Sequence, residues 1–165
     1  FKVDVNERAV ETLHRYGIHP HASFIIGEPQ ETLEQMQETY DFIKRAPLSL
    51  VNIYVLTPLP GTPVWHDAKA KGLVSDDMDW DLLNISFELD WRRVILVSET
   101  MTRSELHRVY QKLRRLRLYK YAKALASHPF QMDLPEYGRA KLVEWAYRAR
   151  SAVTRGSSPV NAGLE

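Results

Sequence analysis

The sequence predicts an α/β fold made of two parallel βα units and a mainly helical extension. The prediction rests first on two short apolar runs, residues 21–26 and 50–56, which each end in a Gly/Pro turn and lead into a helical pattern. It rests also on the helical pattern between them, because strands that are separated by a helix normally pair in parallel. In such folds ligands bind in the loops at the carboxyl ends of the strands.

The first helix has boundary signals at both ends. Asp4 and Glu7 have the spacing of a capping box, and Gly17 stands where a helix commonly ends. We therefore expect a helix over residues 5–16, followed by a strand over residues 21–26.

The next elements are marked in the same way. Thr32 and Gln35 repeat the capping-box spacing at the start of a helix that stops before Pro47. A second strand follows over residues 50–56. Thr62 as N-cap residue, with a proline directly after it, predicts a short helix that ends at Gly72.

Beyond residue 73 the pattern changes. An acidic loop precedes three alternating apolar residues that predict one half-buried strand: Ile85, Phe87 and Leu89. Thr102 and Glu105 then cap a long helix over residues 103–123, and Pro129 separates it from a last helix over about 135–153.

These boundaries divide the chain into four parts. They are a βα part (1–73), an extension of loop, strand and basic helix (74–128), a C-terminal helix (129–155) and a flexible tail (156–165). The chain begins at Phe1 and closes with Leu164 and Glu165, a pair that commonly remains from cloning. We expect a C-terminal portion of a longer protein.

Alternation along the two strands separates two kinds of face. One face is large and apolar, as a face covered by helices requires: Phe24, Ile26, Val51, Ile53 and Val55. The other is mixed and carries groups that can hydrogen-bond: His21, Ser23, Ile25, Asn52, Tyr54 and Leu56. Polar groups on an enclosed face need partners, which are either neighbouring protein groups or a bound ligand.

Composition sets broad limits. The chain has 165 residues, 44% of them hydrophobic, and 22 basic against 21 acidic residues, which fits a globular chain with one main core. No apolar run reaches the roughly 18 residues of a membrane span and no signal segment opens the chain, so we expect a cytoplasmic protein. Without cysteine there is no disulfide and no thiolate metal site.

Residues 24–32 (FIIGEPQET) and 55–63 (VLTPLPGTP) resemble the fifth and sixth βα units of the radical S-adenosylmethionine (radical SAM) enzymes. The similarity is strongest to the branch that carries an upstream cobalamin-binding domain, and it covers residues 4 to about 80. It implies a partial TIM-type barrel of which this chain is the C-terminal half. It also implies SAM and a [4Fe–4S] cluster as cofactors, cobalamin through the upstream domain, and a methyltransferase or related radical modification of an organic substrate.

The family holds its cluster with a C-x-x-x-C-x-x-C loop, and this chain has no cysteine. The resemblance therefore implies that the cluster ligands lie in an upstream half of the same barrel and that this chain alone is inactive. We expect the exposed edge of the first strand to make the isolated chain self-associate, or else the first helix to be partly disordered.

The resemblance also assigns residues. It places the SAM adenosine along Ser23, Ile25 and Gly27 on the first strand, although the acid of the family pattern is displaced by one residue to Glu31. Backbone groups at the end of the second strand would meet the adenine edge: Leu56, Thr57 and Pro58. The remaining residues of the mixed face, His21, Asn52 and Tyr54, would line the substrate cavity. No catalytic residue is assigned.

The sequence predicts no metal site. The histidines share no metal-binding spacing, and the acidic loop lacks the glycine and glutamate of a calcium loop.

The helix over residues 103–123 carries eight basic residues and one acid. We interpret it as an exposed helix whose partners lie elsewhere in a longer protein, with nucleic acid as a less favoured partner. The alternative function is a non-catalytic α/β module that uses this helix to bind nucleic acid or a protein.

Overall fold

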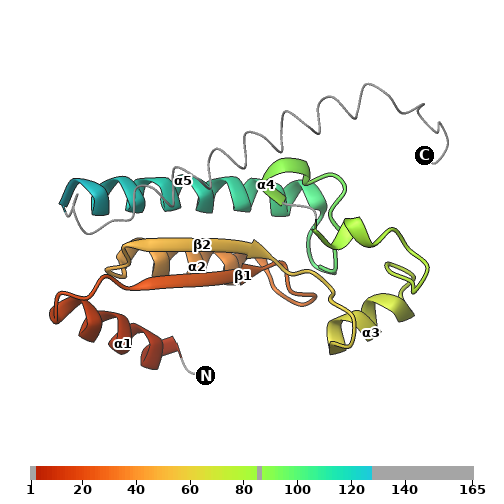
Figure 1. Ribbon diagram of the computed structural model, residues 1–165, viewed down its shortest axis with the longest axis horizontal. Helices are drawn as coiled ribbons and strands as arrows, with labels where there is room; N and C mark the ends of the chain where they lie inside the picture. The colour runs from red at the N-terminus through yellow and green to blue at the C-terminus, as the bar shows by residue number, and fades with distance from the viewer. Residues whose placement is uncertain (1–2, 85–86, 128–165) are drawn as a thin grey trace. The chain divides into compact units, whose positions relative to one another are not determined.

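Two parallel strands lie at the centre of the computed structural model, which describes residues 3–84 and 87–127 (Figure 1). Strand β1 (His21–Ile26) pairs with β2 (Leu50–Val55) in a two-stranded sheet, and α2 (Leu33–Arg45) connects them. The pairing runs from His21 opposite Leu50 to Ile26 opposite Val55. The two parallel strands are confirmed, with β2 ending one residue before the predicted limit. Closure into a barrel stays a prediction.

Side-chain caps fix the starts of α2 and α3 (Pro63–Ala70). In α2 the Gln35 amide donates to Thr32 Oγ1 at 3.3 Å, while the Thr32 amide donates to Gln35 Oε1 at 2.9 Å. At α3 the Trp65 amide donates to Thr62 Oγ1 at 3.2 Å. Both capping predictions are confirmed, because each side-chain oxygen satisfies an amide that has no partner inside its helix.

Helix α1 (Val3–Arg15) begins earlier than expected. Asp4 therefore lies in the first turn, where its carboxylate accepts a hydrogen bond from Arg8 at 3.3 Å, and the predicted capping box with Glu7 is wrong. Glu7 instead pairs with Arg45 of α2 at 2.8 Å. Gly17 does end the helix, with φ of +73° and its amide bonded to the His14 carbonyl.

Helix α5 (Arg103–Ser127) covers the sheet. It packs against β2 and α2, and its Leu106 and Leu113 side chains have no exposed surface. They join Ile26, Val51 and Ile53 in the main core. The compact unit accordingly extends from Phe1 to Ser127, so the long helix belongs to the same body as the two strands.

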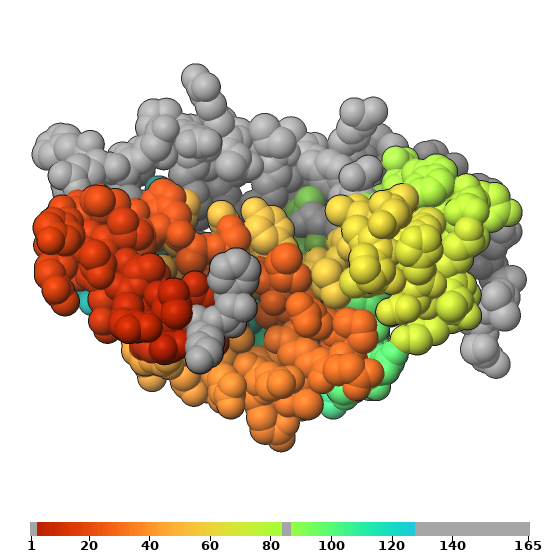
Figure 2. Space-filling view, turned by 90° about the horizontal axis from the view of Figure 1, so that it is seen from below, coloured from red at the N-terminus to blue at the C-terminus, as the bar shows by residue number. Residues whose placement is uncertain are grey.

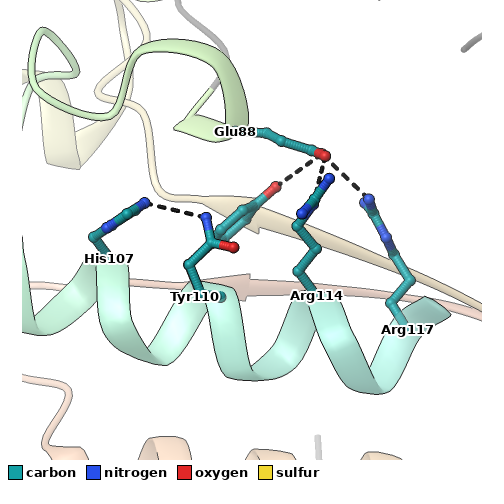
Figure 3. A network of polar contacts seen from close by, with 6 residues as sticks. Glu88, His107, Tyr110, Arg114 and Arg117 are labelled. Atoms are coloured by element: carbon teal, nitrogen blue, oxygen red, sulfur yellow. Dashed lines mark hydrogen bonds and ion pairs between the residues drawn. The ribbon is translucent and has the colours of Figure 1, made fainter. Parts of the chain in front are cut away.

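The basic side chains of α5 find partners within this unit. Arg114 Nε and Arg117 Nη2 bind the Glu88 carboxylate at 2.6 and 3.2 Å, and Tyr110 donates to the same carboxylate at 3.4 Å (Figure 3). Burial raises the pKa of Tyr110 to about 12, with a further contribution from the Glu88 charge. The buried Lys120 donates to the Ala46 carbonyl at 2.6 Å, where it caps the end of α2.

The expectation of an exposed helix with partners elsewhere is therefore wrong for these residues. Arg103 also donates to the Val94 carbonyl, and Lys112 donates to Gln37 of α2 at 2.6 Å. The sequence could not reveal these contacts, because the groups that receive them are 9 to 75 residues away along the chain.

The predicted strand after the acidic loop is also wrong. Phe87 and Leu89 belong to a short helix, α4 (Phe87–Asp90), which follows the 3-10 helix η1 (Trp80–Asn84). Alternation over three residues is too short to separate a strand from a helix. In the structure the Phe87 ring lies edge-on against Tyr110 of α5, with ring centroids 5.0 Å apart. This contact with a distant residue is not visible in the local sequence pattern. Ile85 and the last predicted helix lie outside the described residues.

A second, smaller core lies beside the main one. It contains Trp65 and Ala68 of α3 together with Val74, Ile95 and Val97, and Leu56 packs against it. Trp80 of η1 stacks on Trp65 with ring centroids 5.7 Å apart. Within the described ranges, no helix combines the length and the apolar character that crossing a membrane requires.

Truncation of Leu113 tests whether α5 is the cover of the sheet. We expect Leu113→Ala to lower the free energy of unfolding by about 2–5 kcal/mol, because a fully buried leucine leaves a cavity. Leu118→Ala on the same helix, where 36% of the side chain is exposed, should cost about 1 kcal/mol or less. Urea denaturation followed by circular dichroism measures both. Equal losses would contradict the assignment of α5 as the covering helix.

Candidate functional site

Within residues 3–84 and 87–127, one face of the two-stranded sheet, here called the bare face, is mostly exposed. Ser23 pairs with Asn52 and Ile25 with Tyr54 on this face, and 56% of Ile25 and 55% of Tyr54 are exposed. On the opposite face Ile26 is 0% and Ile53 5% exposed. The predicted division into a covered and a mixed face is thus what the structure contains.

The structure brings the two predicted sets of site residues together. Ser23 and Ile25, assigned to adenosine, lie directly opposite Asn52 and Tyr54, assigned to substrate. His21 lies at the beginning of β1, at the far end of the strand from the loop. A ligand that contacts both strands on the bare face would therefore meet residues of both sets, and their individual roles stay predictions.

The loop after β1 is built around Gly27. Its φ of +84° is in the left-handed region, and a Cβ there would lie 3.1 Å from Cδ2 of Leu106 in α5. Its amide donates to Glu31 Oε2 at 2.6 Å, and the Glu28 amide reaches the same oxygen at 3.4 Å. Burial raises the pKa of the Glu31 carboxyl, while the hydrogen bonds from Gly27 and Glu28 oppose that rise. Glu31 therefore holds the turn that ends β1.

The loop after β2 is less open than expected. The Leu56 amide donates to the Ile26 carbonyl at 2.9 Å, so it is committed to the strand pair. Its side chain packs on the second core, and its place on the mixed face stays a prediction. Thr57 Oγ1 donates weakly to the Val55 carbonyl at 3.4 Å, and Pro58 is fully buried.

The sequence patterns did not indicate that residues 99–100 support the loop after β1. The Glu99 amide donates to the Pro29 carbonyl at 2.9 Å, and Thr100 Oγ1 donates to the Glu31 carbonyl. These partners are about 70 residues apart in sequence, so no local pattern could have indicated the contacts. The segment just before α5 therefore belongs to the site.

A groove runs along β1 between α1 and α2. Its lining includes Val10 and Leu13 of α1, Phe24 of β1, and Phe42 and Arg45 of α2. In the view from below, the red surface of α1 borders the orange surface of the chain segment that contains β1 and α2 (Figure 2). Because β2 is the only strand that pairs with β1 in the described ranges, the other edge of β1 faces this groove.

The residues that the structure describes contain no cluster of three or more His, Cys, Asp or Glu side chains suited to a metal ion. His107 has packing and hydrogen-bonding contacts within the protein. It stacks on Trp91 with ring centroids 4.3 Å apart. It also shares a hydrogen bond with Gln111 at 3.1 Å, drawn as the dashed line from His107 in Figure 3. Burial, with a smaller effect of Arg92, lowers the pKa of His107.

The fold and the site define an α/β unit whose loops follow two parallel strands. The chain is 39% identical over 72 residues to an uncharacterized methyltransferase of Pyrococcus horikoshii, which is 44% of this chain and 16% of that protein. It is 31% identical over 125 residues to the hopanoid C-2 methylase of Rhodopseudomonas palustris, 73% of this chain and 23% of the relative. It is 28% identical over 132 residues to the anaerobic magnesium-protoporphyrin IX monomethyl ester cyclase of Rubrivivax gelatinosus. This match covers 79% of this chain and 22% of the relative.

Shorter matches reach methylthiotransferases, and together the relatives are consistent with the radical SAM superfamily. No protein-family model matches the chain, and no solved structure matches it. The chain spans less than a quarter of the length of each of these three curated relatives. The match to the hopanoid C-2 methylase covers 73% of the 165 residues. A match of this length must include β2 and most of α5, at whichever residue it begins. The similarity therefore extends beyond the two βα units.

Substitution of Gly27 tests the close approach of α5 to the loop. We expect Gly27→Ala to lower the free energy of unfolding by about 2–3 kcal/mol, because the positive φ adds strain and the new methyl group meets Leu106. Gly61→Ala is the control, since Gly61 has φ of +82° but a methyl group added there would have no neighbouring atom within 4 Å. The control should cost only about 1 kcal/mol. Thermal and urea denaturation measure both, and equal costs would show that contact with Leu106 does not matter.

Proposed function

We propose that this chain is part of a radical SAM enzyme, more narrowly a methyltransferase or related enzyme that modifies an organic substrate. The names of the relatives support the enzyme class, since they are methyltransferases, methylthiotransferases, a methylase and a cyclase. One structural observation carries the proposal for this chain. The bare face of the sheet pairs Ser23 with Asn52 and Ile25 with Tyr54 and leads into the Gly27 loop.

In this proposal SAM adenosine lies along Ser23, Ile25 and the loop at Gly27, and the substrate lies against Asn52 and Tyr54. The bare face fits such ligands because it joins an exposed apolar side chain with an aromatic ring and hydrogen-bonding groups. The amides of Gly27 and Leu56 are already bonded within the protein, so adenosine would meet side chains and carbonyl groups here.

The [4Fe–4S] cluster does not fit this chain, which has no cysteine to ligate it. In the proposed enzyme the cluster is held by another part of a longer protein. The upstream half of the barrel would pair with the open edge of β1, next to the groove between α1 and α2 whose lining includes Ser23 and Ile25. Cobalamin would bind to a domain further upstream.

The alternative function, a non-catalytic module with a basic helix, has less support. Arg103, Arg114, Arg117 and Lys120 of α5 contact groups of this chain, which leaves fewer of its basic residues for an external partner. The coding sequence upstream of Phe1 separates the two hypotheses. A C-x-x-x-C-x-x-C loop there would support the enzyme, and its absence would support the module.

Substitutions on the two faces of β2 test the proposed site in the longer, cluster-containing protein. We expect Tyr54→Phe and Asn52→Ala to reduce SAM cleavage with substrate by more than about tenfold, because misplaced reacting groups lose rate steeply. Loss of the Tyr54 hydroxyl should cost less than about 1 kcal/mol of stability. Ile53→Val on the covered face should cost about 0.5–1.5 kcal/mol and change turnover little. Activity that falls only in proportion to stability in all three variants would refute the site assignment.

Cofactor binding by the isolated chain gives a second test. Since a [4Fe–4S] cluster needs thiolate ligands, the purified chain should be colourless, contain no stoichiometric iron after reconstitution and bind SAM weakly or not at all. Iron analysis, visible absorbance and calorimetry measure this. Stoichiometric iron–sulfur absorbance would contradict the proposed division of the protein.

A further inference from the structure

We propose that Glu99 is a positioning residue that fixes the loop after β1 by tying it to the end of α3. The functional part of this inference rests on the proposed adenosine role of the loop. The structural part is carried by contacts that join three segments distant in sequence: residues 27–32 after β1, residue 71 at the end of α3, and residues 98–100 before α5.

The two carboxylate oxygens of Glu99 bind different elements. Oε2 accepts a hydrogen bond from the side-chain amide of Gln30, and Oε1 pairs with the ammonium group of Lys71, the C-cap residue of α3. The backbone of Glu99 adds a third contact, because its amide donates to the Pro29 carbonyl at 2.9 Å. One residue therefore connects the loop that follows β1 with the helix that follows β2.

The loop is also held by contacts that do not involve Glu99. The Glu31 carboxylate holds the amides of Gly27 and Glu28, and the Glu31 carbonyl accepts a hydrogen bond from Thr100. The Glu99 contacts act on the same turn at Pro29 and Gln30. Without the Glu99 side chain the turn loses its attachment to α3, and its internal hydrogen bonds open more often.

Exposure limits what these contacts contribute to global stability. The Glu99 and Lys71 side chains are 40% and 45% exposed, so their ion pair is screened by water and salt. The hydrogen bond and charge of Lys71 lower the pKa of Glu99, which keeps the carboxylate ionised at neutral pH. The expected effect is therefore local order in the loop, with little change in the unfolding of the whole unit.

Hydrogen exchange of the isolated chain tests the structural part. Glu99→Ala should speed exchange of the Gly27 and Glu28 amides about fivefold, the factor that corresponds to loss of a strong surface network. Glu99→Gln should have a smaller effect, because its amide oxygen can still accept from Gln30. Asp76→Ala is the matched control, since Asp76 is 74% exposed and forms its ion pair with Lys69, within α3 and away from the loop. Unchanged loop exchange, or equal acceleration at all amides, would overturn the inference.

The longer SAM-binding protein tests the functional part. Glu99→Ala should raise the KM for SAM about fivefold while kcat changes less than about twofold, and Lys71→Met should do the same. A purely structural residue would instead lower the amount of folded enzyme and leave KM unchanged. Faster loop exchange with an unchanged KM would overturn the positioning role and would locate the error in the adenosine assignment. Unchanged exchange would locate it in the Glu99 contacts themselves.

Discussion

The contact between α5 and the apolar face of the sheet is the interaction on which the rest of the structure depends. Two parallel strands with a single connecting helix do not bury enough surface to be stable alone. Leu106 and Leu113 complete the core around Ile26 and Val51, and both leucines are fully buried. Because α2 and α5 pack into the same core, one face of the sheet is covered and the residues of the other face stay accessible to a ligand.

Local patterns predicted the elements whose determinants lie within a few residues. The Thr32 and Thr62 caps and the side-chain alternation along both strands depend on neighbours one to three positions away, and the structure contains them. Local patterns failed where another element decides. Phe87 lies in a short helix and packs on Tyr110, and the basic residues of α5 are held by groups such as Glu88, which no pattern in the helix itself could indicate.

Sequence patterns also predict the candidate site only in part. Alternation correctly places Ile25 and Tyr54 on the same face, and the structure adds the register that makes them direct neighbours. It gives no information on which backbone amides are already bonded. The Gly27 amide is held by Glu31, and the Leu56 amide by the Ile26 carbonyl. The strand ends therefore offer fewer donors than the sequence suggested, and recognition must depend more on side chains.

The start of α5 links the core to the site. Glu99 and Thr100, just before the N-cap Thr102, hold the loop after β1. Leu106 in the first turns of α5 leaves little room for a side chain at position 27, where the positive φ also favours glycine. The same few residues thus begin the covering helix and set the shape of the candidate ligand loop. A change that shifts the first turns of α5 along β2 would consequently move the loop as well. The packing of Leu106 on the sheet and the position of the loop after β1 are therefore linked through the same helix end.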